Sequence, residues 1–477
     1  MNRDLSPPSS VRPTYVRYGV LAFACSLSMI TYLDRAAIGV TQEPVREAYG
    51  FNSVADLKWT AFAFSLAYAL FEVPTGWLGD VFGPRRTLIR IVLWWSFFTA
   101  LTGLAGYHFA GLVLLPFAGL VAIRFLFGIG EAGAYPNITR ALHNWFPAQE
   151  RGLAQGVVWM SGRLMGGLTA LIWMVLVTRG GLHWRAAYLL FGSLGVAWCI
   201  LFVFWFRNRP EEKASVGAAE LALIRTSVGH EAERAHGDIP WRILLSPTLW
   251  FLCMMYFCMS YAWYFNMFYL PAYLKQQHGV ADDDLLGQLY KGGPLILGAG
   301  ACLLGGYLTD RYVRRTGDRR WGRRLYGMLG HAACIPCCLA CIIAPTAFTF
   351  ALAIALAGFF NDLAMGPAWA ACQDVGKKHA AIVAGCMNMI GNLGGAASAW
   401  LTGALLDWSH AAYAVPRGLD PAALNAANLK AAELPGYQIN FWICAGLYVV
   451  AVFLWLGIDA TRPVLPEDAA DTGVPAG

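Results

Sequence analysis

Apolar residues occur along the chain in runs of about 20, separated by short stretches that carry charges, proline or glycine. A helix of about 20 residues spans the ~30 Å hydrocarbon core of a bilayer. Open sheets and irregular loops cannot face lipid, and the runs lack the alternation of a β-barrel. The pattern therefore predicts an all-α membrane protein with twelve transmembrane helices. Their cores are expected at 18–40, 57–78, 88–106, 110–135, 152–178, 185–206, 247–273, 287–310, 325–343, 347–371, 380–405 and 438–458.

The longest polar stretch lies between the sixth and seventh runs, from Arg207 to Arg242, and is rich in Glu, Arg, Ala and His. It divides the chain into two equal sets of spans. We therefore predict a six-helix bundle over 1–206, a cytoplasmic linker over 207–246, and a second six-helix bundle with a cytoplasmic tail over 247–477. A second long loop is expected from Asp407 to Gly436.

The two halves repeat one another in sequence. The segment Gly76 to Asp80 returns as Gly306 to Asp310, 230 residues later. Glu131 is echoed by Asp362 at an offset of 231. A constant offset across separate motifs indicates a duplicated six-helix unit, an arrangement typical of transporters that rock around a site at the membrane midplane.

Composition supports the membrane assignment. Hydrophobic residues make up 57% of the chain and charged residues 13%, whereas soluble domains carry about 25% charged residues. The first residues, Met1 to Pro13, are polar, and the apolar run after Tyr18 is longer than the core of a secretory signal. We expect this run to stay in the protein as the first span.

The distribution of basic residues predicts the orientation. Placing both termini in the cytoplasm puts most of the 35 lysines and arginines on the cytoplasmic side, as the positive-inside rule requires. The densest basic cluster, Arg311 to Arg324, lies between the eighth and ninth spans. We interpret it as an anchor against anionic lipid.

The twelve cysteines lie almost wholly within apolar runs, so a secreted disulfide framework is not expected. Cys334, Cys337, Cys338 and Cys341 share one helical face, but their neighbours are apolar. Packing of small side chains is therefore favoured over a metal site. The sequence also has no phosphate-binding loop and no nucleophile constellation, which argues against an enzyme or an ATP-driven pump.

The segment Gly76 to Arg86, with the sequence GWLGDVFGPRR, resembles the signature loop between the second and third helices of the major facilitator superfamily. Gly306 to Arg311 is a weaker second copy. The resemblance implies that an aspartate, basic residues and a helix N-terminus latch the outward-facing state. It assigns gating, not substrate contact, to Asp80, Arg85, Arg86 and Asp310.

A narrower resemblance covers most of the chain. The segments Tyr32 to Arg35, Arg124 to Pro136, Glu150 to Gly152 and Gly385 to Gly395 are similar to the anion:cation symporter branch of that superfamily. This branch includes bacterial sugar-acid and aromatic-acid proton symporters, sialin and the vesicular glutamate transporters. The resemblance implies an organic anion as substrate without naming one.

Among the charged residues inside the predicted spans, five stand out as candidates: Asp34, Arg35, Arg124, Glu131 and Arg163. Each charge costs at least about 2.5–3.5 kcal/mol to insert, so these residues are functional candidates. Three arginines against two acids predict a net positive core, which suits an organic anion because a guanidinium binds a carboxylate with two parallel hydrogen bonds. The alternative is a structural network of salt bridges. Whether Arg163 faces the cavity stays open.

Proton coupling needs a carboxyl group that changes its protonation state in a desolvated site. Glu131 and Asp34 are the candidates. Our hypothesis is that ionised Glu131 pairs with an arginine and weakens anion binding. Protonated Glu131 would release that arginine, so that proton and anion move together.

Several polar and aromatic residues complete the expected substrate pocket. Asn388 and Asn392 form an i, i+4 pair that could bind substrate or could join helices. The full expected substrate-binding set is Arg35, Tyr32, Tyr68, Arg124, Arg163, Asn388, Asn392, Trp369 and Gln373.

These patterns predict a monomeric secondary transporter in the bacterial inner membrane, without cofactor and without nucleic acid partner. It would take up an organic acid anion (a sugar acid, a dicarboxylate or an aromatic carboxylate) with protons, by alternating access. The alternatives are an anion exchanger or exporter, such as a drug/proton antiporter, and a transporter-like ligand sensor. A cationic core argues against cationic drugs, and sodium in place of protons stays open.

Overall fold

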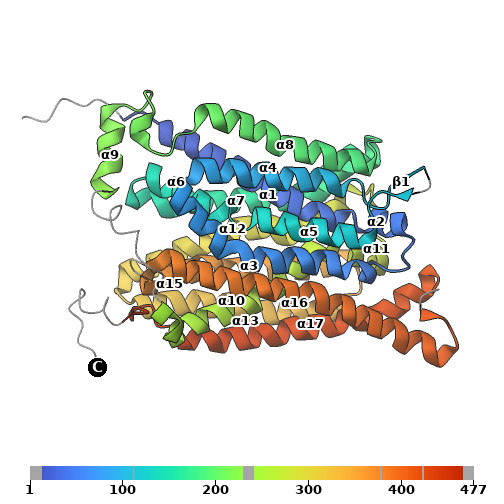
Figure 1. Ribbon diagram of the computed structural model, residues 1–477. Helices are drawn as coiled ribbons and strands as arrows, with labels where there is room; N and C mark the ends of the chain where they lie inside the picture. Colours follow the sequence, from blue (N-terminus) through green and yellow to red (C-terminus); the bar gives the residue numbers. More distant parts are fainter. Residues whose placement is uncertain (1–12, 111, 229–240, 377–378, 422–423, 466–477) are drawn as a thin grey trace, which may run out of the picture.

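The computed structural model describes residues 13–110, 112–228, 241–376, 379–421 and 424–465. Long helices run side by side over most of the chain (Figure 1). Those of the first half are α1 (Val16–Val40), α3 (Lys58–Phe82), α4 (Pro84–Thr102), α5 (Phe117–Glu131) continued by α6 (Ala134–Trp145), α7 (Ala148–Trp173) and α8 (Trp184–Trp205). Those of the second half are α10 (Pro247–Phe268) continued by α11 (Leu270–His278), α12 (Leu285–Thr316), α13 (Arg319–Ile343), α14 (Ala347–Leu363) continued by α15 (Met365–Gly376), α16 (Ala380–Ala414) and α17 (Ala426–Gly457).

Short elements connect the long helices. They are α2 (Gln42–Tyr49), the π-helical turn Met174–Arg179 after α7, α9 (Ala218–Val228), and 3-10 turns at Val54–Leu57, Pro210–Glu212, Trp241–Leu245 and Val415–Arg417. The strands β1 (His108–Phe109) and β2 (Leu112–Val113) pair antiparallel in a small hairpin, with His108 opposite Val113. The helix α9 lies at the end where α1 begins, whereas α2 and α11 lie at the opposite end (Figure 1).

The twelve-helix architecture agrees with the hydrophobic pattern, and the all-α fold class is confirmed. Within the described ranges, nine helical stretches are long and apolar enough to cross a membrane by length and composition. The helices α4, α10 and α16 complete the twelve. Of these, α4 has two arginines in its first turn, and α10 is rich in tyrosine and tryptophan, which lowers the mean hydropathy of both helices.

Three boundaries differ from the prediction. The fourth span was expected from residue 110, but its helix begins at Phe117, directly after Pro116, because the preceding segment forms the hairpin. The loop expected from Asp407 to Gly436 is shorter, since α16 continues to Ala414 and α17 begins at Ala426. The predicted linker is not wholly irregular, because it contains α9.

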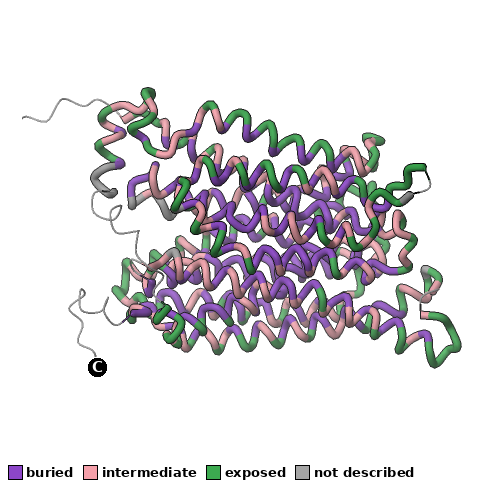
Figure 2. Tube along the Cα trace, viewed as in Figure 1, coloured by how far each residue is buried: buried purple, intermediate pink, exposed green. Residues whose placement is uncertain are grey.

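Burial follows the bundle arrangement. The contact region between helices is buried, whereas the outer helix faces and the ends are exposed (Figure 2). The outer faces carry large apolar side chains such as Leu201 and Phe204 of α8 and Phe453 of α17, which are 63–77% exposed. Apolar side chains on the outside of a helical bundle fit contact with lipid.

The helices α7 and α12, one from each half, cross at a pair of glycines. A Cβ placed on Gly292 would lie 1.8 Å from the carbonyl oxygen of Gly167. The two backbones can approach this closely only because neither residue has a side chain.

Replacing Gly292 with alanine should therefore force α7 and α12 apart. We expect the midpoint of thermal unfolding to fall by about 2 to 5 °C, as overpacking of a close contact does. Differential scanning fluorimetry of the purified protein measures this shift. Gly300 on α12 is the matched control, because a Cβ there would meet no atom within 4 Å. A Gly292→Ala variant as stable as Gly300→Ala would contradict the proposed crossing.

Candidate functional site

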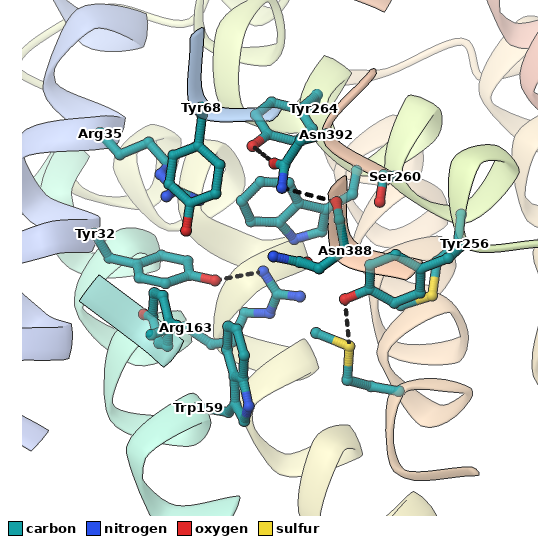
Figure 3. Close-up of a pocket in the computed structure, with 14 residues that line it drawn as sticks. Tyr32, Arg35, Tyr68, Trp159, Arg163, Tyr256, Ser260, Tyr264, Asn388 and Asn392 are labelled. Atoms are coloured by element: carbon teal, nitrogen blue, oxygen red, sulfur yellow. Dashed lines mark hydrogen bonds between the residues drawn. The ribbon is translucent and has the colours of Figure 1, made fainter. Parts of the chain in front are cut away.

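A cavity lies near the centre of the bundle, between helices of the two halves. It encloses about 40 Å³, room for roughly three water molecules. Its polar and charged side chains converge from α1, α3, α7, α10 and α16 (Figure 3). The lining residues are Tyr32, Arg35, Tyr68, Tyr135, Trp159, Arg163, Tyr256, Met259, Ser260, Trp263, Tyr264, Met365, Asn388 and Asn392.

Arg35 of α1 is held by Glu131, the last residue of α5. The Nε atom of Arg35 donates to Oε1 of Glu131 at 3.0 Å, and its Nη2 atom donates to the same oxygen. Both side chains are buried, and the other Glu131 oxygen, Oε2, has no hydrogen-bond partner among the described residues. The guanidinium lies 4.8 Å from the ring centre of Tyr68. A buried acid therefore holds a cavity-lining arginine along one edge.

The position of Glu131 follows from a break in its span. The helix α5 ends at Glu131 and α6 begins at Ala134, with Gly133 between them. Pro136 follows in the first turn of α6 and has no N–H to continue the helical hydrogen bonds. The break places Glu131 in mid-span, where it meets α1.

Arg163 of α7 also lines the cavity, which answers the question that the sequence left open. Its Nη1 atom donates to the Tyr32 hydroxyl at 2.9 Å. Its Nη2 atom donates to Oδ1 of Asp362 at 3.0 Å, and Nε lies 2.8 Å from Oδ2 of the same carboxylate. Asp362 belongs to α14, so this ion pair joins the two halves. Sequence analysis identified Asp362 only as the echo of Glu131, although a lone acid in an apolar span was a sufficient signal.

Asp34 and Arg124 are fully buried but do not line the cavity. Asp34 accepts a 3.4 Å hydrogen bond from Thr99 of α4. The Arg124 guanidinium lies 4.5 Å from the ring centre of Phe127 and 5.1 Å from that of Phe64. Direct substrate contact was expected for Arg124, but its guanidinium is directed at these rings rather than into the cavity.

The amide pair on α16 meets a buried acid of the first half. Asn388 and Asn392 both donate to the carboxylate of Glu72 on α3, the second of them at 3.3 Å. The Tyr264 hydroxyl donates to Oδ1 of Asn392 at 2.6 Å. The two amides therefore line the cavity and also join the two halves. This geometry fits both interpretations of the pair, substrate binding and contact between helices.

Glu72 and Asp362 change the charge count of the core. With them, the buried charges around the cavity that the structure describes are four acids and three arginines (Arg35, Arg124 and Arg163), so the predicted net positive core is wrong as a count. The prediction counted only Asp34 and Glu131. The arginines still dominate the cavity wall, because Arg35 and Arg163 line it while none of the four acids does.

Aromatic rings form part of the cavity wall. Tyr135 and Trp159 stack with ring centres 4.2 Å apart, and Trp159 contacts Trp369 of α15 at 5.5 Å. Trp369 lies behind this wall and donates to the Tyr256 hydroxyl at 3.4 Å. Gln373, expected in the pocket, is exposed and is not among the residues that line this cavity.

The expected gating residues lie away from the cavity. Asp80 is in α3, and its side chain is outside the described part of the structure. Arg85 donates from its backbone N–H to Asn208 at 3.0 Å, and its guanidinium bonds the carbonyl oxygen of Val203; Arg86 is exposed.

The second motif copy forms a defined ion-pair network. Arg323 lies 2.9 Å from Asp310 and 2.8 Å from Asp374. The sequence had assigned Arg323 only to a lipid anchor. In the structure its two ion pairs join α13 to α12 and α15.

Polar contacts link the two halves at the end that carries α2 and α11. They join Lys58 to Asp407, Ser53 to Glu433, and Glu43 to Gln276. The second and third of these are 3.2 Å hydrogen bonds. Side chains of both halves are therefore in contact at this end.

The family model described as Major Facilitator Superfamily matches residues 24–399. The chain belongs to the Major Facilitator Superfamily. The members of this family that it resembles are transporters, not enzymes. A probable sulfoacetate transporter of Cupriavidus necator is 33% identical over 419 residues, covering 87% of this chain and 92% of that protein. A probable galactarate/D-glucarate transporter of Bacillus subtilis is 27% identical over 408 residues, covering 80% and 84%.

Solved structures of the Major Facilitator Superfamily share the fold. A bacterial homologue of the lysosomal transporter Spinster, in an inward-facing and unoccupied conformation, superposes with a TM-score of 0.71 at 19% identity, covering 93% of this chain and 97% of that one. A D-xylose–proton symporter superposes with a TM-score of 0.69 at 13% identity, covering 94% and 99%. The chain is thus a membrane transporter of this superfamily whose relatives carry anions.

Proposed function

We propose that this chain takes up an organic acid anion together with protons, as a symporter that works by alternating access. The observation that carries the proposal is the ion pair between Arg35 and Glu131, in which a cavity-lining arginine is held by a buried acid. The anion relatives support the choice of substrate class.

The geometry supports a coupled cycle. Ionised Glu131 neutralises Arg35, so an incoming carboxylate or sulfonate competes with it for the guanidinium. A proton taken up by Glu131 removes that competition, and Oε2 is the oxygen free to carry it. Arg35 then binds the anion, and both charges cross the membrane together when the halves rock. Asp34, buried next to Arg35 in the chain, is the second candidate for the coupling proton.

We further propose that both termini and α9 lie in the cytoplasm of a bacterial cell, with 1–206 and 247–477 as the two moving bundles around a linker at 207–246. The excess of basic residues at that side supports this orientation. The contacts of Lys58 with Asp407 and of Ser53 with Glu433 would then close the outer end. The proposed working unit is a monomer, since the cavity is built within one chain.

Uptake into proteoliposomes tests this function. The purified protein would be reconstituted and given labelled sulfoacetate, D-glucarate or D-galacturonate, with an inward proton gradient imposed. We expect one of these acids to accumulate above its external concentration, and a protonophore to abolish the accumulation. A sodium gradient in place of the proton gradient tests whether sodium, and not the proton, drives accumulation.

The alternatives give different results. Exchange of internal for external anion without any gradient-driven accumulation would indicate an exchanger. Saturable binding without either transport mode would indicate a sensor. Neither binding nor transport of any of the three acids would contradict the proposed substrate class.

A further inference from the structure

Arg35 and Arg163 are held by acids in the same way. A guanidinium has five N–H donors and can bind a carboxylate along either of two edges, Nε/Nη2 or Nη1/Nη2. Glu131 takes the Nε and Nη2 donors of Arg35. Asp362 lies against the Nε and Nη2 atoms of Arg163, at 2.8 and 3.0 Å. In both arginines the acid thus occupies the Nε/Nη2 edge and leaves the other edge to a second partner.

The arginines face the cavity and the acids that hold them do not. Arg35 and Arg163 are among the lining residues, whereas Glu131 and Asp362 are not. On Arg163 the other edge carries the Tyr32 hydroxyl, bonded to Nη1 at 2.9 Å, which points from α1 toward the guanidinium (Figure 3). Cys302 of α12 also interacts with this guanidinium, so one of the five N–H groups of Arg163 is left without any of these three partners. An acidic ligand group can bind there without displacing Asp362.

The two arginines are close enough to act on one small molecule. Their guanidinium carbons lie 5.5 and 5.7 Å from the centre of the same Tyr32 ring. The carbons are therefore separated by no more than the sum of these two distances. Two acidic groups joined by a short chain span such a gap when each is bound end-on by one guanidinium.

Asp362 is fixed in place, so it acts as a positioning residue for Arg163. Asn361 donates to its Oδ1 at 3.2 Å, and the Tyr448 hydroxyl donates to Asn361 at 2.9 Å. On the other side the carboxylate lies against α12, where a Cβ on Gly298 would come within 2.3 Å of Oδ2. The ring of Trp263, 4.4 Å from the guanidinium, supports Arg163 from α10.

We propose that Arg163, oriented by Asp362 and completed by the Tyr32 hydroxyl, is a second anion subsite, so that the substrate is a small dianion with one acidic group on Arg35 and the other on Arg163. This inference rests on the proposed function and narrows its substrate class. An arginine that served only to join the halves would need no position on the cavity wall. Monoanions of the same size fill one subsite and bind more weakly.

Matched ligand pairs test the subsite on the purified full-length protein by isothermal titration calorimetry at pH 7. Each pair differs in one acidic group: D-glucarate against D-gluconate, succinate against succinamate, and sulfoacetate against sulfoacetamide. For at least one pair we expect the wild-type protein to bind the diacid about tenfold or more tightly than its partner. We expect Arg163→Gln to bind both members alike, at the affinity of the monoacid.

Asp362→Asn provides a test that does not depend on the stability of Arg163→Gln. It removes a competing charge and keeps an acceptor beside Arg163, so the preference for the diacid should increase severalfold. A wild-type protein that binds both members equally, a preference that survives Arg163→Gln, or a preference unchanged in Asp362→Asn would each overturn the subsite. Equal binding would leave the proposed function standing, whereas no binding of any acid would contradict that function as well.

Discussion

Replacing Arg35 with glutamine is expected to weaken anion binding at least about thirtyfold and to abolish uptake. The substitution removes the guanidinium that meets the substrate, and it leaves Glu131 buried without its cation. Losing one partner of a buried, hydrogen-bonded charge pair costs about 2–5 kcal/mol. Isothermal titration calorimetry with the acid that the wild-type protein binds, together with uptake into proteoliposomes, measures both effects.

Two variants make the Arg35 result specific. Arg35→Lys keeps the charge but loses the two-pronged geometry, so intermediate binding is expected. Arg417→Gln is the control for removing an arginine elsewhere, because Arg417 is exposed and contacts Tyr413 near the α2–α11 end. Unchanged affinity in a folded Arg35→Gln protein would show that the anion binds elsewhere.

Replacing Glu131 with glutamine is expected to abolish proton-driven accumulation of the anion while anion exchange across the membrane continues. The amide cannot exchange a proton, and as a neutral group it resembles the protonated acid that releases Arg35. Accumulation driven by a proton gradient should fall to the external concentration, whereas exchange of internal for external anion should stay within a few-fold of the wild-type rate. Both are measured in the same proteoliposomes.

Glu131→Asp is the matched control, since it keeps a titratable group at this position. We expect it to accumulate substrate at a reduced rate. Loss of exchange as well as accumulation in Glu131→Gln would argue for a structural role of the pair. Proton-driven accumulation that persists in Glu131→Gln would show that another acid carries the coupling proton, with Asp34 as the next candidate.

Much of the fold was predictable from sequence because lipid imposes a strict rule on backbone hydrogen bonds. Every apolar run of sufficient length had to be a helix. The helix ends were less predictable. The polar residues after Asp407 and before Gly436 suggested a loop, but helices α16 and α17 continue beyond the apolar region. There Ser409 donates to the carbonyl oxygen of Ala432, and the Tyr413 hydroxyl donates to Asn428.

The site was predictable in its residue types and less so in its pairings. Insertion cost alone drew attention to Arg35 and Glu131, but their contact depends on how α1 meets the break after α5. Asp362 and Glu72 were visible as acids in spans, yet only the packing of the second half against the first shows what they hold. Gln373 is exposed, and the sequence alone does not show how far along α15 the cavity extends.

The central claim is that protonation of Glu131 and binding of an anion to Arg35 are one linked event. Proton uptake on binding measures this link directly. Purified protein in weakly buffered solution near neutral pH would be mixed with the acid that it binds, and the change in pH recorded. The account predicts that wild-type protein takes up about one proton for each anion bound, and that Glu131→Gln binds the anion without proton uptake. Full anion binding by the wild-type protein with no proton uptake at any pH would contradict it.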